Sequence, residues 1–369
     1  MKQALLLLTQ NHSSFKSGRI MAKIEKLRGV AFLAFPEMKN LLASELAERF
    51  GYGKIIESAT ISGTSFSNFG ESTWYGDLLY CPDFDTALFK ASDEAEASFP
   101  YWARSVMAEP FLLHFESIGE AASSLKQIQR NWAPYQYQCF RRASLIQEKL
   151  PYINLKVRKF PANVPASQIG LYTLLDEKTL IASALTSSPL PAGTIAFEED
   201  HENPPSRAYL KIQESLTLFH TFFGVDFPKE GDKCFEAGAC PGGWTWVLRQ
   251  LGADVLAVDR AELAPGLMAD PHVKFLAHDA FTLKPEEVCL LLNCEKIDWL
   301  LSDVICYPER LFDWINTWRQ SGRAKNIICT IKMQGAINWP LIAEFAKIPN
   351  SKVVHLNYNK HELTIMIDS

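Results

Sequence analysis

The second half of the chain alternates between short apolar runs and longer stretches in which apolar residues recur at helical spacing. The runs that predict β-strands lie near residues 233–237, 254–258, 273–276, 297–302, 326–331, 352–356 and 362–367. Helical patterns lie between most of them, and a helix predicted over 207–223 precedes the first. This alternation favours a doubly wound α/β domain, in which helices cover both faces of a mostly parallel sheet. The last two runs are close in sequence, so they are predicted to pair as a hairpin-like edge.

The first half shows a less regular pattern, typical of smaller α+β domains. Strands are predicted at 29–35, 111–115, 153–157 and 169–175, and helices at 38–50, 120–132 and 139–150. We therefore expect an α+β domain over 1–95 and a second one over 96–186. Met21 is a second plausible start, so residues 1–20 are expected to be an extension outside the main fold. Four prolines and an acidic cluster mark 187–205 as a linker to the α/β domain at 206–369.

Composition narrows the class of protein without deciding its function. The chain has 369 residues, 47% of them hydrophobic, and a net charge of −5, which by itself does not indicate a nucleic-acid-binding protein. None of the eight cysteines forms a C-x-x-C pair, so we expect reduced thiols, a cytoplasmic location and no metal site. No apolar run approaches the roughly 18 residues of a membrane span, so no membrane partner is expected.

A glycine-rich turn follows the first predicted strand of the α/β domain. The turn lacks the G-x-G-x-x-G order of nicotinamide enzymes and the lysine of a P-loop, and it contains a proline. A turn that holds a ribose and an amino-acid tail, rather than a pyrophosphate, suits S-adenosylmethionine. Asp259 ends the next strand at a position suited to grip a ribose diol, and Asp279, after the third strand, is the candidate for the adenine amino group. The predicted cofactor-binding residues are Glu236, Gly238, Cys240, Pro241, Gly242, Gly243, Trp244, Asp259, Asp279 and Asp303.

Four charged residues stand where strands or the leading helix should face the ligand crevice. They are Lys211 on the helix before the turn, Asp303 and Lys332 at strand ends, and Glu362 at the start of the last strand. A charge that abuts a buried strand is costly to desolvate unless it is paired, and at the carboxyl end of a parallel strand it more often serves a ligand. The alternative is that they are unrelated surface charges.

The second half of the chain resembles the FtsJ-like 2′-O-ribose methyltransferases of RNA, and most closely the branch of large-subunit ribosomal RNA methyltransferase M. The residues that carry the resemblance are Ser206–Ile212, Gly238–Trp244, Ser302–Asp303, Ile331–Met333 and His361–Leu363. It implies a Rossmann-like fold that uses S-adenosylmethionine, preceded by ferredoxin-like and THUMP-like RNA-binding domains. It also implies methylation of a cytidine in large-subunit (23S) RNA.

In that family a Lys-Asp-Lys-Glu tetrad carries the reaction, and it falls here on Lys211, Asp303, Lys332 and Glu362. The sequence departs from the branch at Glu236, where Asp is usual, and in the segment 304–308. A lysine acting as a base needs a depressed pKa, and we expect Lys211 to supply that effect on Lys332 as a like charge. Three alternatives remain. The first is a methyltransferase of the same fold that acts on a base, a protein or a small molecule, and the second is a catalytically idle RNA-binding protein. A nicotinamide enzyme is the most remote of the three.

Residues 126–160 hold eight basic side chains against one acidic one, with aromatic residues between them. Basic groups with aromatic neighbours suit phosphate contact and base stacking. The alternative is a solvated basic helix face whose aromatic residues lie in the core. The predicted RNA-binding residues are Lys126, Arg130, Arg141, Arg142, Lys156, Arg158 and Lys159.

Overall fold

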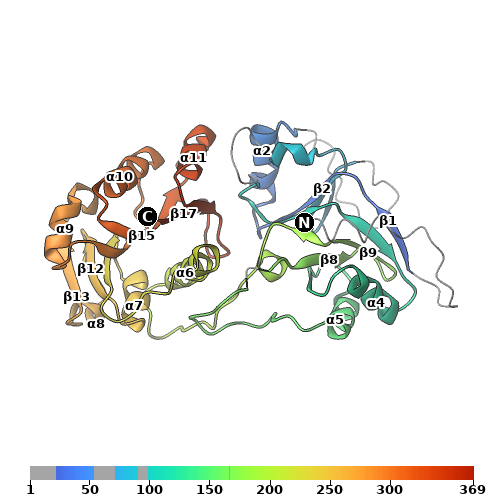
Figure 1. The fold of residues 1–369 in the computed structure, drawn as a ribbon, viewed down its shortest axis with the longest axis horizontal. Helices are drawn as coiled ribbons and strands as arrows, with labels where there is room; N and C mark the ends of the chain where they lie inside the picture. The colour runs from blue at the N-terminus through green and yellow to red at the C-terminus, as the bar shows by residue number, and fades with distance from the viewer. Residues whose placement is uncertain (1–21, 54–70, 90–98, 166) are drawn as a thin grey trace. The chain divides into compact units, whose positions relative to one another are not determined.

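The structure is a computed structural model that describes residues 22–53, 71–89, 99–165 and 167–369. The expected extension over 1–20 lies outside the described residues. The chain divides into two compact units, the first formed by 1–156 with 166–195 and the second by 157–165 with 196–369. Figure 1 shows the helices and strands of each unit.

The described residues of the first unit form two five-stranded sheets. One has the order β1 (Lys23–Lys26), β6 (Phe111–His114), β9 (Thr179–Ser183), β8 (Gly170–Leu174) and β7 (Trp132–Pro134). The other has the order β10 (Leu185–Thr186), β5 (Ala103–Ala108), β2 (Val30–Ala34), β4 (Leu78–Cys81) and β3 (Thr73–Tyr75). Strand pairing therefore crosses the boundary that the sequence predicted between 95 and 96, because β1 pairs with β6 and β5 pairs with β2.

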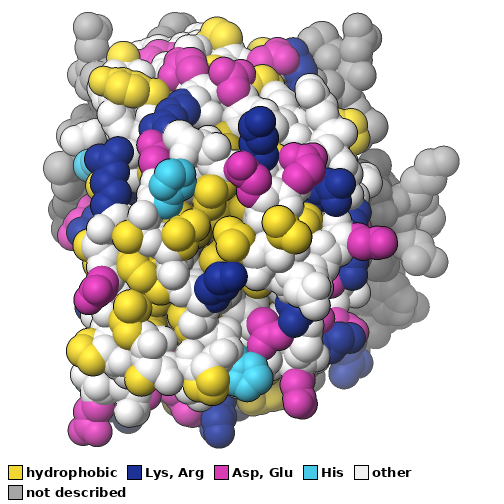
Figure 2. All heavy atoms as spheres, turned by 90° about the vertical axis from the view of Figure 1, so that its left-hand side faces the viewer, with side chains coloured by type: hydrophobic (Ala, Val, Ile, Leu, Met, Phe, Trp, Pro, Cys, Tyr) yellow, Lys and Arg dark blue, Asp and Glu magenta, His cyan; other side chains and the backbone are white. Residues whose placement is uncertain are grey.

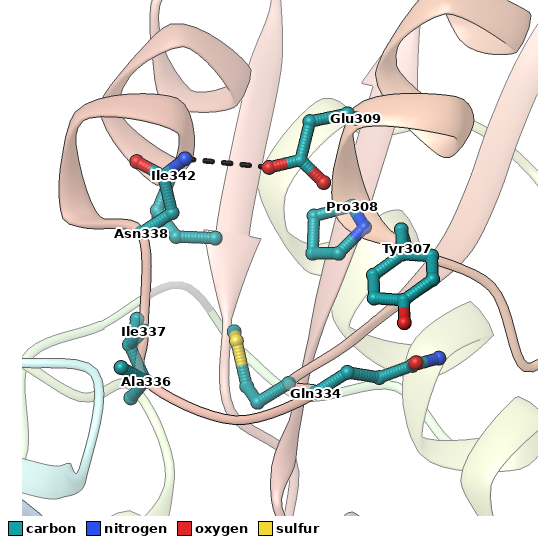
Figure 3. Close-up of a pocket in the computed structure, with 9 residues that line it drawn as sticks. Tyr307, Pro308, Glu309, Gln334, Ala336, Ile337, Asn338 and Ile342 are labelled. Carbon is teal, nitrogen blue, oxygen red and sulfur yellow. Dashed lines mark hydrogen bonds between the residues drawn. The ribbon is translucent and has the colours of Figure 1, made fainter.

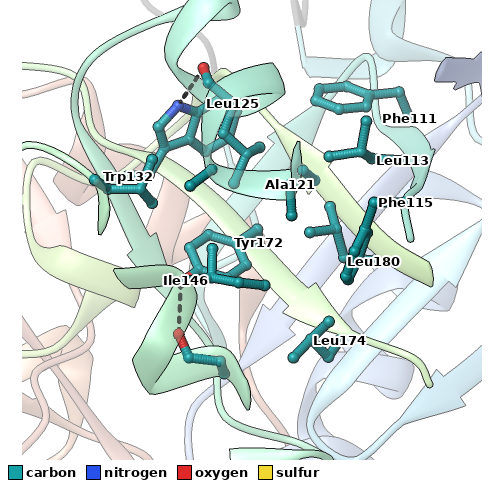
Figure 4. Close-up of a cluster of buried hydrophobic side chains, with 14 of the residues drawn as sticks. Phe111, Leu113, Phe115, Ala121, Leu125, Trp132, Ile146, Tyr172, Leu174 and Leu180 are labelled. Atoms are coloured by element: carbon teal, nitrogen blue, oxygen red, sulfur yellow. Dashed lines mark hydrogen bonds between the residues drawn. The ribbon is translucent and has the colours of Figure 1, made fainter. Parts of the chain in front are cut away.

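Helices α4 (Ile118–Ile128) and α5 (Phe140–Lys149) contribute to a buried core with the sheet that contains β8 (Figure 4). Trp132 is fully buried there, and its Nε1 donates a hydrogen bond of 2.9 Å to the carbonyl oxygen of Leu125. The helix predicted over 120–132 therefore ends four residues earlier, and Trp132 begins β7 instead. In contrast, α2 (Lys39–Phe50) ends where predicted, at Gly51, whose φ of 66° is left-handed.

The second unit has one seven-stranded sheet. Its order is β13 (Val273–Ala277), β12 (Asp254–Asp259), β11 (Lys233–Ala237), β14 (Ile297–Ser302), β15 (Ala324–Lys332), β17 (Glu362–Asp368) and β16 (Ser351–Val354). The first five are parallel, and β17 is antiparallel to both neighbours. The predicted doubly wound α/β class is confirmed. The last two strands pair with each other as expected, but β17 lies inside the sheet and only β16 is at the edge.

Helices cover both faces of this sheet. Figure 1 shows α6 (Tyr209–Phe223) and α7 (Gly243–Gln250) on one side, and α10 (Pro308–Ser321) and α11 (Trp339–Ala346) on the other. The short helices α8 (Pro265–Met268) and α9 (Pro285–Leu291) connect the strands toward β13 and β14. Proline at the first position of α8, α9 and α10 fixes the start of each, since its missing N–H would have no helical partner there.

The segment 153–157 is not the strand that the sequence predicted. Leu155 and Val157 are 46% and 55% exposed, so their apolar side chains fill no core. From residue 157 the chain joins the second unit, where the N–H of Arg158 donates to the carbonyl oxygen of Ala196 and the N–H of Glu198 donates to that of Arg158. The predicted linker over 187–205 is divided in the same way, because residues from 196 onward belong to the second unit.

Candidate active site

The sheet order brings the four predicted charged residues to one edge. Asp303 directly follows β14, and Lys332 is the last residue of the parallel neighbour β15. Glu362 begins the antiparallel strand β17 and is the register partner of Lys332. Lys211 reaches the same place from α6, which packs against β17.

These residues form a closed ring of alternating charge, which we call the tetrad. The Nζ of Lys211 lies 3.1 Å from both carboxylate oxygens of Asp303 and also forms an ion pair with Glu362. The Nζ of Lys332 donates to Asp303 Oδ1 at 2.6 Å and to Glu362 Oε2 at 2.7 Å. Each ammonium therefore has two carboxylate partners, and each carboxylate has two ammonium partners. The arrangement compensates charges that would be costly to bury singly.

The electrostatics of the tetrad differ from the expectation for Lys332. Burial lowers its pKa, but Asp303 and Glu362 outweigh that effect, and the pKa lies above its usual value. Burial likewise opposes ionisation of Asp303, yet Lys211 and Lys332 hold its pKa below its usual range. The expected depression of the Lys332 pKa by Lys211 is therefore wrong, because the two adjacent anions outweigh burial and the pKa is raised.

The glycine-rich turn connects β11 to α7, and a Cβ added at Gly238, Gly242 or Gly243 would clash with a neighbouring side chain. Gly238 and Gly242 have φ values of 78° and 107°, which L side chains rarely adopt. A Cβ on Gly243 would lie 2.5 Å from the Oγ of Ser206, a buried oxygen with no hydrogen-bond partner among the described residues. A backbone cradle with an unpartnered hydroxyl beside it fits a ligand that has a polar tail.

Asp259 holds this turn from the neighbouring strand. Its Oδ2 accepts a hydrogen bond of 3.0 Å from the N–H of Cys240, and its Oδ1 accepts one of 3.1 Å from the N–H of Ala261. Cys240 is exposed, and so is Pro241 beside it. A carboxylate has about four acceptor positions, so Asp259 retains capacity to accept from a ribose diol.

Glu236 lies beneath the turn as a buried acid that is 3% exposed. Burial raises its pKa to about 8, and the hydroxyl of Thr245, which donates to Oε2 at 2.5 Å, opposes the rise. Asp303 and Asp259, as like charges, contribute to the same rise. Glu236 is therefore mainly protonated in the folded chain at neutral pH.

Two other predicted cofactor residues have different surroundings from those expected. The carboxylate of Asp279 accepts from Arg310 Nη2 at 3.0 and 3.3 Å and from the N–H of Phe281, so it already has a cationic partner. The indole of Trp244 is 2% exposed and packs in the interior. Trp244 lies in the first turn of α7, where backbone N–H groups have no intrahelical partner.

Residues 204–330 match the family model described as FtsJ-like methyltransferase. The second unit carries an FtsJ-like methyltransferase domain. The match covers strands β11 to β14 and most of β15, and it includes Lys211 and Asp303. It ends before Lys332 and Glu362.

Relatives share the same region. The chain is 30% identical over 170 residues to ribosomal RNA large subunit methyltransferase M of Alkalilimnicola ehrlichii. The aligned region covers 44% of this chain and 45% of that protein. The chain is 29% identical over 211 residues to the protein of that name from Hahella chejuensis, which covers 55% and 49% of the two chains. The matched stretches thus span about half the length of these relatives. A ribosomal RNA methyltransferase from Plasmodium falciparum matches 44% of this chain at 16% identity, with a TM-score of 0.33.

The FtsJ-like domain contains a buried acid that the sequence pattern did not single out. Glu214 is 1% exposed, and its carboxylate accepts hydrogen bonds from Asn357 and Tyr358. The spacing along the helix could have revealed it. Glu214 lies one helical turn after Lys211, on a helix whose neighbouring residues are also buried.

The predicted RNA-binding residues do not form one set. Four of them are exposed in the first unit: Lys126 and Arg130 at the end of α4, Arg141 on α5, and Lys156. Two others, Arg158 and Lys159, belong to the second unit. Arg142 is half-buried, and its guanidinium lies 5.6 Å from the centre of the Phe115 ring.

The aromatic residues of segment 126–160 divide in a similar way. Trp132 is in the core, whereas Phe140 and Tyr152 are 58% and 78% exposed. Two aromatic rings therefore remain open for stacking.

The described residues offer neither a metal site nor a membrane span. Within the ranges that the structure describes, no group of three His, Cys, Asp or Glu side chains is arranged to hold a metal ion. No helix in those ranges is long and apolar enough to cross a bilayer.

Proposed function

We propose that this protein transfers a methyl group from S-adenosylmethionine to the 2′-hydroxyl of a ribose in large-subunit ribosomal RNA. The observation that carries the proposal is the tetrad, in which two lysines and two carboxylates converge at the sheet edge that also bears the glycine-rich turn. A ribose hydroxyl is a weak nucleophile, so it has to be positioned and relieved of its proton. A ring of fixed donors and acceptors suits both tasks.

The residues present fit the methyl donor. The backbone from Gly238 to Trp244 and the Ser206 hydroxyl would hold its amino-acid tail, and Asp259 would hold its ribose. Asp279 would accept from the adenine amino group with the acceptor capacity that Arg310 leaves. Bound there, S-adenosylmethionine supplies a sulfonium methyl group as the electrophile.

Lys332 is the residue closest to a general base in this proposal. Its raised pKa means that the ammonium has to lose a proton before it can accept one from the ribose hydroxyl. The positive charge of a bound donor favours that loss, since like charges disfavour the charged form of an amine. Asp303 and Glu362 fix the direction of the Lys332 amine. An amine held in this way can keep the ribose hydroxyl in line with the methyl group, and such alignment supplies much of the rate.

Ribosomal RNA is the substrate class that the relatives' names support, and cytidine as the target rests on the family resemblance. We propose that the first unit comprises THUMP-like and ferredoxin-like parts, as the resemblance implies. We also propose that it binds RNA through Lys126, Arg130, Arg141 and Lys156 and through the exposed rings of Phe140 and Tyr152. The side of the molecule on which α9 and β13 lie shows basic and acidic side chains interspersed (Figure 2), not a continuous basic surface.

The proposal is tested by incubating the protein with an isotopically labelled donor and ribosomal RNA from cells that lack its gene. After complete nuclease digestion, mass spectrometry of the nucleosides should find the label on ribose. Label on a base would instead favour a methyltransferase of the same fold with a different target, and no label in RNA would contradict ribosomal RNA as the substrate.

A further inference from the structure

A pocket opens beside the tetrad (Figure 3). Its lining includes no residue of the tetrad or of the glycine-rich turn. One wall is the start of α10 with the loop before it, and the other is the loop between β15 and α11. The side chains that line it include Tyr307, Glu309, Met333, Gln334, Asn338 and Ile342.

Both walls begin at tetrad residues. Met333 is the residue directly after Lys332, and Tyr307 is four residues after Asp303. The pocket therefore lies at the carboxyl edge of the adjacent strands β14 and β15, next to the point where the methyl acceptor has to sit. A ribose with its hydroxyl at Lys332 would place its own base within reach of this pocket.

The lining combines groups that recognise a planar heterocycle. Tyr307 is 65% exposed, and Ile305 in the same loop is 81% exposed, so large apolar side chains are presented to solvent here. An aromatic ring in such a position offers a face on which a base can stack. Met333 adds a polarizable thioether, and Gln334 adds an amide.

The polar end of the pocket has a defined acceptor. Glu309 Oε1 accepts from Asn338 Nδ2 at 3.3 Å, and Asn338 Oδ1 accepts from the N–H of Leu341, which fixes the amide orientation (Figure 3). A carboxylate has about four acceptor positions, so Glu309 retains capacity to accept from a further donor. A carboxylate accepts from the exocyclic amino group of cytosine, whereas uracil presents a carbonyl at the same position.

We propose that this pocket holds the base of the target nucleotide, with Tyr307 stacked on it and Glu309 accepting from its exocyclic amino group. The inference rests on the proposed function, because it takes the acceptor to be a ribose of RNA. The base is rotated out of any stack to reach the pocket, as in other enzymes that modify nucleic acids. The pocket thereby favours cytosine or adenine over uracil.

The first test uses the full chain, the labelled donor and ribosomal RNA from cells lacking the gene. Tyr307→Ala should raise the KM for RNA roughly ten-fold or more, as loss of one base stack does, while donor affinity stays unchanged. Tyr307→Phe keeps the ring and should stay close to wild type. Leu290→Ala removes another exposed side chain, 82% exposed on α9, and should have no effect.

The second test needs no methyl transfer. With S-adenosylhomocysteine present, fluorescence anisotropy should show tighter binding of oligo(C) and oligo(A) than of oligo(U), and Glu309→Gln should remove that preference. Glu344→Gln, an exposed acid on α11, should preserve it.

The two tests separate the inference from the proposed function. If wild type methylates ribose but the Tyr307 and Glu309 variants behave like their controls, the pocket assignment is overturned and the function stands. If the base preference depends on Glu309 but no RNA is methylated, the pocket holds a base and the proposed function fails.

Discussion

Glu214 connects the helix that carries Lys211 to the turn that leads to Glu362, and its principal partner is Asn357. The Glu214 carboxylate accepts from the N–H of Asn357 at 2.9 Å, from its Nδ2 at 2.7 Å and from the N–H of Tyr358 at 3.1 Å. A single buried side chain thus fixes two members of the tetrad relative to each other.

Replacing Glu214 by alanine should leave buried donors without partners. Each such donor costs about 1–3 kcal/mol, so we expect Glu214→Ala to lower the free energy of unfolding by roughly 2–4 kcal/mol, measured by denaturant titration. Glu214→Gln keeps one acceptor oxygen and should lose less. If Glu214→Ala were as stable as Glu344→Ala, a change on the exposed face of α11, the connecting role would be wrong.

Asp259 should contribute to donor binding in two ways, by holding the turn through Cys240 and by contacting the ribose. Asp259→Ala removes both, and we expect at least ten-fold weaker binding of S-adenosylmethionine in calorimetry. Asp259→Asn keeps one acceptor oxygen for Cys240, so its affinity for S-adenosylmethionine should lie between those of wild type and Asp259→Ala. Unchanged affinity in the alanine variant would contradict the placement of the donor.

Glu236 should make stability depend on pH. Its pKa is about 8 in the folded chain, against an ordinary value of 4.5 when unfolded, so only the folded state stays protonated between these values. The stability that it contributes is present below pH 4.5 and is lost as the pH rises to about 8. Within that window the free energy of unfolding should fall by up to about 1.4 kcal/mol per pH unit, and Glu236→Gln should flatten the fall in unfolding experiments from pH 5 to 9. Curves of equal slope for the two proteins would refute the assignment.

Arg141 and Arg142 should have different roles although they are adjacent. Arg141 is exposed, so Arg141→Ala should weaken RNA binding and reduce the slope of log affinity against log salt by about 0.7–0.9. Arg142 lies against Phe115, so Arg142→Ala should chiefly lower the melting temperature. RNA titrations and thermal melts of both variants test this difference. Loss of melting temperature in Arg141→Ala with weaker RNA binding in Arg142→Ala would contradict the interpretation.

The convergence of the tetrad could be predicted because geometry enforces it. Parallel strands place their carboxyl ends at one edge, so Asp303 and Lys332 had to meet once the strands were recognised. The antiparallel direction of β17 brings Glu362 to the same edge.

Features that depend on the surroundings of a side chain could not be predicted in the same way. Leu155 and Val157 alternate like a strand but have no core to face. The strand β1 pairs with β6 although many residues separate them, and local pattern does not encode such pairing. The charge of Lys332 depends on the distances to two carboxylates, which spacing along the chain does not give.

The central claim is that the tetrad transfers a methyl group to a ribose 2′-hydroxyl, and Lys332 tests it most directly. The measurement compares wild type with Lys332→Ala on ribosomal RNA from cells lacking the gene, and maps the product by alkaline hydrolysis, which a 2′-O-methyl group blocks at one position. We predict one protected position with wild type, none with Lys332→Ala, and donor affinity that is nearly equal in the two proteins. Protection by Lys332→Ala at the wild-type rate would contradict the account.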